Sequence, residues 1–88
     1  MWYSYLLISI KDESWYIGCT NDIKSRLNEH NCGQSKYTKS HFPYKLVYFE
    51  VCLSKKDAYH RERYLKSGSG RKWLNNRLRD YFENRLGT

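Results

Sequence analysis

The stretch WYSYLLISI, residues 2–10, constrains the fold more than any other part of the chain. It is rich in β-branched and aromatic residues, carries no helix-capping pattern, and is apolar at odd and even positions alike. A strand that is apolar on both faces is typical of the centre of a covered sheet. Because the chain has only 88 residues, its core must be small. We therefore expect one domain over residues 1–88, in which helices cover a short sheet.

The next part of the chain predicts a hairpin followed by a helix. Residues 15–19 come after a polar turn, KDES, and have the composition of a second strand. Thr20 or Asn21 is expected to cap the helix, with Asp22 in its first turn, where a negative charge suits the helix dipole. Gly33 is expected to end this helix.

The second half of the chain predicts a third strand and two helices. Residues 45–53 alternate, so that one side of the strand carries Val47, Phe49, Val51 and Leu53. Ser54 is expected to cap the second helix, and SGSG at 67–70 to break it. A last helix to about residue 86 has its apolar positions at Leu74, Leu78, Tyr81 and Phe82. The order β-β-α-β-α-α predicts an α+β fold with its core over about residues 2–74.

The charge balance favours a polyanionic partner. Sixteen Lys and Arg against nine Asp and Glu give a formal net charge of +7. Such an excess is typical of nucleic-acid-binding domains, although it can also serve solubility alone.

Cysteine usage and hydropathy argue against several classes of protein. Cys19, Cys32 and Cys52 are widely spaced and form no CxxC pair, unlike a disulfide framework or a closed zinc site. No apolar run reaches membrane-spanning length, and the N-terminus lacks the pattern of a signal peptide. We therefore expect a cytoplasmic protein with reduced thiols and no membrane association.

Four polar residues of the hairpin and the first helix are candidates for a site. Tyr5 and Tyr16 lie on strands that are expected to pair, so their rings can be neighbours, although strand tyrosines commonly serve packing alone. Arg26 and His30 stand at i and i+4 beside the inner stripe of the helix, with no obvious anionic partner nearby in the sequence. A solvated basic face is the alternative for this pair.

Glu62 is a carboxylate on what should be an apolar stripe. It lies four residues after Ala58 and three before Leu65, which both belong to the inner face of the second helix. A carboxylate there is costly unless a cation or metal meets it. The alternatives are an ion pair with Arg26 or a helix tilt that exposes Glu62 to water. Phosphodiester cleavage needs a base, positive charge and commonly a metal, all of which these residues offer.

The order of these residues resembles the GIY-YIG nuclease superfamily. The resemblance rests on YSY at 3–5, YIG at 16–18, Arg26 with His30, and Glu62. The stretches YIGCTNDIKSRLNEHNCG, FPYKLVYFE and AYHRERYLKSGSGRKWL are similar to small, single-domain bacterial members, which are themselves similar to the catalytic module of the excision-repair incision subunit.

The resemblance implies a small three-stranded antiparallel sheet flanked by helices and metal-dependent cleavage of DNA. The functional positions of the family fall on Tyr5, Tyr16, Gly18, Arg26, His30 and Glu62. Two departures are Tyr3 and Ser4, where the first motif has Gly and Ile, and Cys19, where the excision-repair module has a lysine.

As a mechanism, Glu62 is expected to hold a single Mg²⁺ or Mn²⁺, and Arg26 to contact the scissile phosphate. Tyr5 or Tyr16 is expected to take the proton from the attacking water, with His30 as a proton relay. Gly18 allows close approach of the backbone and substrate. Further phosphate contacts are predicted at Lys36, Lys39, Arg71 and Lys72, for which ordinary surface charge is the alternative.

Two other functions are consistent with the same sequence. One is a catalytically silent nucleic-acid-binding module, and the other is a protein-interaction domain that uses its aromatic surface. For the nuclease, the expected substrate is DNA, with RNA not excluded, and the expected context is DNA repair or recombination. Specificity would come from the loop at 34–44, a homodimer or a protein partner.

Overall fold

The computed structural model describes residues 1–35 and 38–84, and it has the predicted α+β fold. Its elements in chain order are β1 (Trp2–Ser9), β2 (Trp15–Thr20), α1 (Ile23–Asn31), β3 (Tyr44–Cys52), α2 (Lys55–Lys66), α3 (Gly68–Arg77) and α4 (Arg79–Asn84). Both strand pairs are antiparallel, and the order in the sheet is β2-β1-β3. The central place predicted for the first strand is therefore confirmed.

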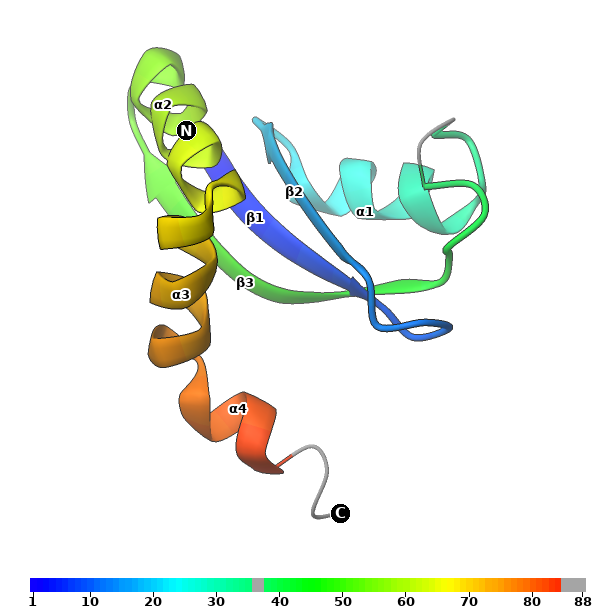
Figure 1. Cartoon of the computed structure of the whole chain (residues 1–88). Coiled ribbons are helices and arrows are strands. Elements are labelled where there is room, and N and C mark those ends of the chain that lie inside the picture. Colours follow the sequence, from blue (N-terminus) through cyan, green and yellow to red (C-terminus); the bar gives the residue numbers. More distant parts are fainter. Residues whose placement is uncertain (36–37, 85–88) are drawn as a thin grey trace.

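Helices cover both faces of this sheet, with α1 on one side and α2, α3 and α4 on the other (Figure 1). Leu6 and Ile8 of β1 pack against Leu65 of α2 and Leu74 of α3. Tyr5 and Leu7 point to the opposite face, where Ile23 and Leu27 of α1 are among the side chains packed against them. This alternation explains why β1 is apolar at odd and even positions.

The strand β3 differs from its predicted alternation. Leu6 pairs with Tyr48 and Leu7 with Leu46, so Val47 is the extra residue of a β-bulge. Val47 packs on the side of α2 and α3, whereas Phe49 lies on the face of Tyr5 and is 48% exposed. The prediction that Val47, Phe49, Val51 and Leu53 share one side is therefore wrong.

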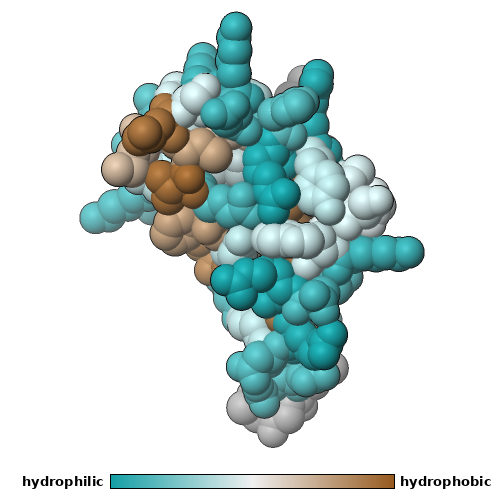
Figure 2. Space-filling view, turned by 90° about the vertical axis from the view of Figure 1, so that its left-hand side faces the viewer, coloured by the Kyte–Doolittle hydropathy of each residue, from teal (hydrophilic) through white to brown (hydrophobic). Residues whose placement is uncertain are grey.

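The exposed apolar residues at the end of β3 include Phe49, Val51 and Leu53. Seen from the left of Figure 1, the molecule shows hydrophobic side chains gathered in one area, with hydrophilic side chains over most of the remaining surface (Figure 2).

Two helix boundaries also differ from the prediction. The N-cap of α1 is Asp22, whose side chain accepts a hydrogen bond from the Ser25 amide, rather than Thr20 or Asn21. The SGSG sequence does end α2, but α3 begins within it at Gly68, because Ser67 caps the new helix through the Gly70 amide. A side chain at Gly70 would bring its Cβ to 2.6 Å from the Leu65 Cα, so glycine lets the two helices meet.

The last predicted helix is divided into α3 and α4, with Leu78 at the C-cap of α3. The predicted end near residue 86 lies outside the described residues. Among the described helices, none combines the length and apolar character that crossing a membrane requires.

Candidate active site

The register between β1 and β2 brings the two tyrosines together. Tyr5 lies opposite Gly18, and Tyr16 lies opposite Leu7, so the tyrosines are diagonal neighbours whose ring centroids are 6.3 Å apart. A Cβ at Gly18 would lie 2.6 Å from the Tyr5 Cζ and also overlap its hydroxyl. The Tyr5 phenol therefore occupies the space that glycine leaves open at the edge strand.

Helix α1 adds His30 to this pair. The His30 side chain is 1% exposed, and its ring centroid is 4.7 Å from that of Tyr16. Its Nε2 atom lies 3.3 Å from the Tyr5 hydroxyl, and its Nδ1 atom lies 2.9 Å from the Thr38 hydroxyl. Thr38 is fully buried, so the imidazole is held between two hydroxyl groups.

Burial fixes the protonation of both groups. It raises the pKa of Tyr5 well above its usual range, and the nearby Tyr16 and Glu62 add to this rise while Arg26 opposes it. Burial also lowers the pKa of His30, and the positive charge of Arg26 lowers it further. At neutral pH, Tyr5 is therefore a neutral phenol beside a neutral imidazole.

The lowered pKa of His30 predicts a loss of stability in mild acid. The unfolded chain has an ordinary histidine with a pKa of about 6.5 and takes up a proton below that pH, whereas folded His30 resists protonation. The free energy of unfolding should therefore fall as the pH is lowered from 7 towards 5, by at most about 1.4 kcal/mol per pH unit. Urea denaturation over this range should show a smaller decrease for His30→Gln. If the free energy of unfolding depends on pH equally in the wild type and in His30→Gln, His30 is not the origin of the loss.

Arg26 lies on the outer, solvent-facing side of the cluster formed by Tyr5, Tyr16 and His30. Its guanidinium is close enough to Tyr5 to influence the phenol, and it forms an ion pair of 3.0 Å with Glu29. The prediction that no anionic partner lies nearby in the sequence is therefore wrong, since Glu29 is three residues away. The Arg26 side chain is 46% exposed, which leaves it accessible to an anion from solvent.

Glu62 approaches from α2, on the other side of the sheet. Its carboxylate is 14% exposed and lies 3.5 Å from the Lys66 Nζ atom. The predicted alternative of an ion pair with Arg26 is wrong, because each residue has a partner on its own helix. Helix α2 packs against β1 and β2, and the negative charge of Glu62 contributes to the raised pKa values of Tyr5 and Cys19.

The donor set around Glu62 fits only one kind of metal site. In residues 1–35 and 38–84, no group of three or more His, Cys, Asp or Glu side chains is arranged to hold a metal ion. Mg²⁺ is commonly bound through one or two carboxylates, with water and substrate phosphate completing its shell. Glu62 therefore fits as a single protein ligand to such an ion, and a closed structural metal site is a poor fit.

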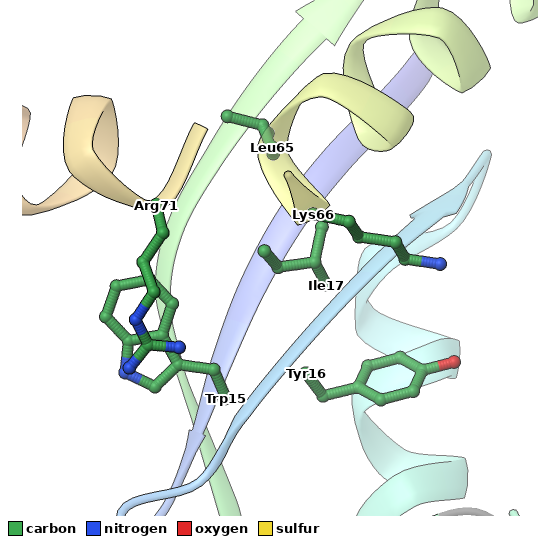
Figure 3. A pocket seen from close by; sticks show the side chains of 6 residues that line it. All are labelled: Trp15, Tyr16, Ile17, Leu65, Lys66 and Arg71. Atoms are coloured by element: carbon green, nitrogen blue, oxygen red, sulfur yellow. The ribbon is translucent and has the colours of Figure 1, made fainter. Parts of the chain in front are cut away.

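A cleft of about 480 Å³ runs along β2 beside α2 and the start of α3. Figure 3 shows its six lining side chains, with Ile17 and Leu65 between the two cations Lys66 and Arg71. The Arg71 guanidinium lies over the Trp15 ring, with its Cζ atom 3.9 Å from the ring centroid. Tyr16 also lines the cleft, and it belongs to β2, an edge strand of the sheet.

The structure thus brings Tyr5, Tyr16, Gly18, Arg26 and His30 together at one edge of the sheet. It places Glu62 next to Lys66, which lines the adjoining cleft with Arg71. Lys39 and Lys72 are exposed and do not line the cleft, and Lys36 lies outside the described residues. Sequence reasoning missed Lys66, although its i+4 spacing from Glu62 was a usable signal. It also missed Thr38, for which the sequence offers no local signal.

Comparisons with known proteins identify a family. A family model described as the GIY-YIG catalytic domain matches residues 1–76. A UPF0213 protein of Clostridium perfringens is 48% identical over 66 residues, which cover 73% of this chain and 69% of that protein. The UPF0213 protein YazA of Bacillus subtilis is 40% identical over 63 residues, covering 70% of this chain and 64% of that protein.

A solved structure is similar over most of the chain. The solution NMR structure of a UPF0213 protein from Bacillus halodurans superposes with a TM-score of 0.53 at 35% identity. The match covers 86% of this chain and 84% of the other.

Proposed function

This chain belongs to the GIY-YIG family of nucleases, and from that premise we propose that it is an endonuclease that hydrolyses DNA phosphodiester bonds at the edge of β2. The observation that carries the proposal is that two phenols, an imidazole and a guanidinium meet at that edge, with the Glu62 carboxylate paired to Lys66 of the adjoining cleft. These groups come from four different elements, β1, β2, α1 and α2. Packing of a hydrophobic core does not by itself require polar groups from four elements to lie close together.

The chain's own residues divide the work according to their burial and charge. Arg26 is exposed and cationic, so it neutralises charge on the scissile phosphate as the attacking water adds to phosphorus. Tyr16, in its phenolate form, accepts a proton from that water while the phosphorus–oxygen bond to the leaving strand breaks, and the departing oxygen takes a proton from solvent. The raised pKa of the buried Tyr5 opposes formation of the phenolate on that residue. Tyr5 and His30 hold the geometry through their mutual contact, and Thr38 orients the imidazole.

Glu62 would hold a divalent ion, Mg²⁺ or Mn²⁺, which when bound supplies further positive charge to the phosphate. Lys66 is already paired with Glu62 and stays beside the carboxylate as a second source of positive charge.

Charge and shape support a nucleic-acid substrate. The net charge of +7 attracts a polyanion, and the cations Lys66 and Arg71 border the cleft beside Tyr16. We propose DNA as this substrate, in DNA repair or recombination, with RNA as a second substrate to be tested. A protein partner or a second copy of the chain would then supply specificity.

The ion pair between Glu62 and Lys66 favours one alternative, a binding module without catalysis. In that case the cation satisfies the buried carboxylate permanently and no metal enters. This module would bind nucleic acid with a salt-dependent affinity and would leave it intact.

A cleavage assay separates the two functions. The protein is incubated with labelled single strands, duplexes, flaps and junctions of DNA and RNA, with Mg²⁺, Mn²⁺ or EDTA. We expect new fragments with the divalent ions and none with EDTA. Binding of the same substrates without any fragments in Mn²⁺ would contradict the nuclease and support the binding module.

A further inference from the structure

We propose that the cleft along β2 is a subsite for one unpaired nucleotide base next to the cleaved phosphate. This inference rests on the proposed nuclease function and names the class of its substrate. The residues that carry it are Trp15, Ile17, Leu65, Lys66 and Arg71, which line the cleft together with Tyr16 (Figure 3).

One end of the cleft is a stack of three planar groups. The Phe82 and Trp15 rings are parallel within 6° and have centroids 5.6 Å apart. The Arg71 guanidinium covers Trp15 at 3.9 Å, and Arg71 forms no ion pair with any residue that the structure describes. The stack therefore holds a flat cationic surface at the edge of the cleft. Nucleic-acid-binding proteins stack unpaired bases on such guanidinium planes.

The middle of the cleft is apolar. Ile17 of β2 and Leu65 of α2 lie between the two cationic ends, and Leu65 belongs to the buried core beneath. A volume of about 480 Å³ lies within the range of small-ligand sites. The two faces of a base are apolar and suit the contact with Ile17 and Leu65. In a duplex the neighbouring bases cover both faces, so the cleft selects a base that is unstacked.

The other end of the cleft leads to the catalytic groups. Lys66 extends past Ile17 on the side of Tyr16, and its ammonium group lies 3.5 Å from the Glu62 carboxylate. A base that rests near Arg71 would therefore place its own phosphate at the Lys66 end, beside Tyr16 and Glu62. The subsite thus aligns one particular phosphate with the groups that cleave it.

Binding in EDTA tests this subsite without requiring cleavage. The probes are a fluorescent oligothymidine strand, a strand of equal length and charge that is abasic throughout, and a fully paired duplex of equal length. Stacking of one base contributes enough affinity for about a tenfold difference, so we expect the thymidine strand to bind about tenfold more tightly than the abasic strand. Equal affinity for these two strands, which carry the same charge, would overturn the proposal.

Substitutions at Arg71 then localise the effect. Arg71→Lys keeps the charge but loses the planar group, so it should remove most of the preference for the thymidine strand and leave the salt dependence unchanged. Lys24→Ala, which removes one charge from the exposed surface of α1, should weaken both strands equally. Retention of the full base preference by Arg71→Lys would also overturn the subsite, and thermal melting verifies that each variant is folded.

This experiment separates the two proposals. A protein that prefers the thymidine strand and cuts no substrate in Mn²⁺ would refute the nuclease and keep the base subsite. A protein that cuts DNA but binds the thymidine and abasic strands equally would support the nuclease and refute the base subsite.

Discussion

Replacing Glu62 by glutamine should reduce metal-dependent cleavage by about 10²–10³-fold, the usual effect of removing one group that stabilises charge in the transition state. Glutamine has nearly the same shape but carries no charge, so it binds a divalent ion far more weakly than a carboxylate does. The measurement is the initial rate of cleavage of a labelled substrate in saturating Mn²⁺, compared between the wild type and Glu62→Gln.

The fold should survive this change. Glu62 forms an i,i+4 pair with Lys66, whose side chain is 56% exposed, and such pairs contribute about 0.3–0.5 kcal/mol. Urea denaturation should therefore give nearly the same free energy of unfolding for both proteins. Glu83→Gln, on the exposed surface of α4, is the matched control, because it removes the same charge away from the site.

A second measurement follows the metal itself. Mn²⁺ broadens the NMR signals of nearby nuclei, so amides around Glu62 and Cys19 should lose intensity in the wild type and keep it in Glu62→Gln. Full activity in the variant, together with unchanged broadening, would show that Glu62 is not the metal ligand. Absence of both activity and broadening in the wild type would favour the silent binding module.

The parts of the fold that the sequence predicted depend on local patterns. The two apolar faces of residues 2–10 specify a strand that must be covered on both sides, which is where β1 lies. Ser54 caps α2 as expected, because its side chain accepts the Asp57 amide within the same turn. His30 lies on the inner side of α1 because its spacing from Ile23 and Leu27 places it there.

The errors arose where tertiary contacts overrule a local pattern. The bulge at Val47 changes the side to which later residues of β3 point, and a regular alternation cannot reveal such an insertion. The SGSG sequence looks like a linker, yet Gly70 is required by the close contact between the start of α3 and the end of α2. Thr20, Asn21 and Asp22 are all favoured N-cap residues, so composition alone could not identify Asp22 as the N-cap of α1.

The candidate site divides in the same way. Spacing on one helix indicated that Arg26 and His30 belong together. The place of Glu62 on an apolar stripe singled it out, and the family resemblance then implied its metal-binding role. The contact between Thr38 and His30 joins α1 to the loop that follows it, and the stack of Arg71 on Trp15 joins segments distant in sequence. Both became visible only in the folded chain. Only the second of these contacts borders the cleft, so the family motifs alone do not reveal a base subsite.

Gly18→Ala is the second change with a large expected effect. The new methyl group would overlap the Tyr5 hydroxyl and lie 2.6 Å from its Cζ atom, and Tyr5 is only 3% exposed, so its ring has little room to move. Overpacking of this kind costs about 1–3 kcal/mol, which urea denaturation would measure. A ring displaced by about 1 Å would also disturb the contact with His30, and cleavage should fall by about 10²-fold. Gly68→Ala is the control, since apart from its chain neighbours and the backbone of its own helix no atom lies within 4 Å of its added Cβ.

The cause of the Gly18→Ala effect can be tested in a second background. Tyr5→Phe removes the hydroxyl that overlaps the new methyl group, while the rest of the ring stays in the same place. If the overlap is the cause, Gly18→Ala should cost less stability in Tyr5→Phe than in the wild type, and the difference measures the coupling between the two positions. Cleavage should remain low in the double variant, because it lacks the phenol that contacts His30. An equal cost in both backgrounds would mean that the Tyr5 hydroxyl does not set the requirement for glycine, and that the Cζ atom of the ring, which both backgrounds keep 2.6 Å from the new methyl group, is sufficient.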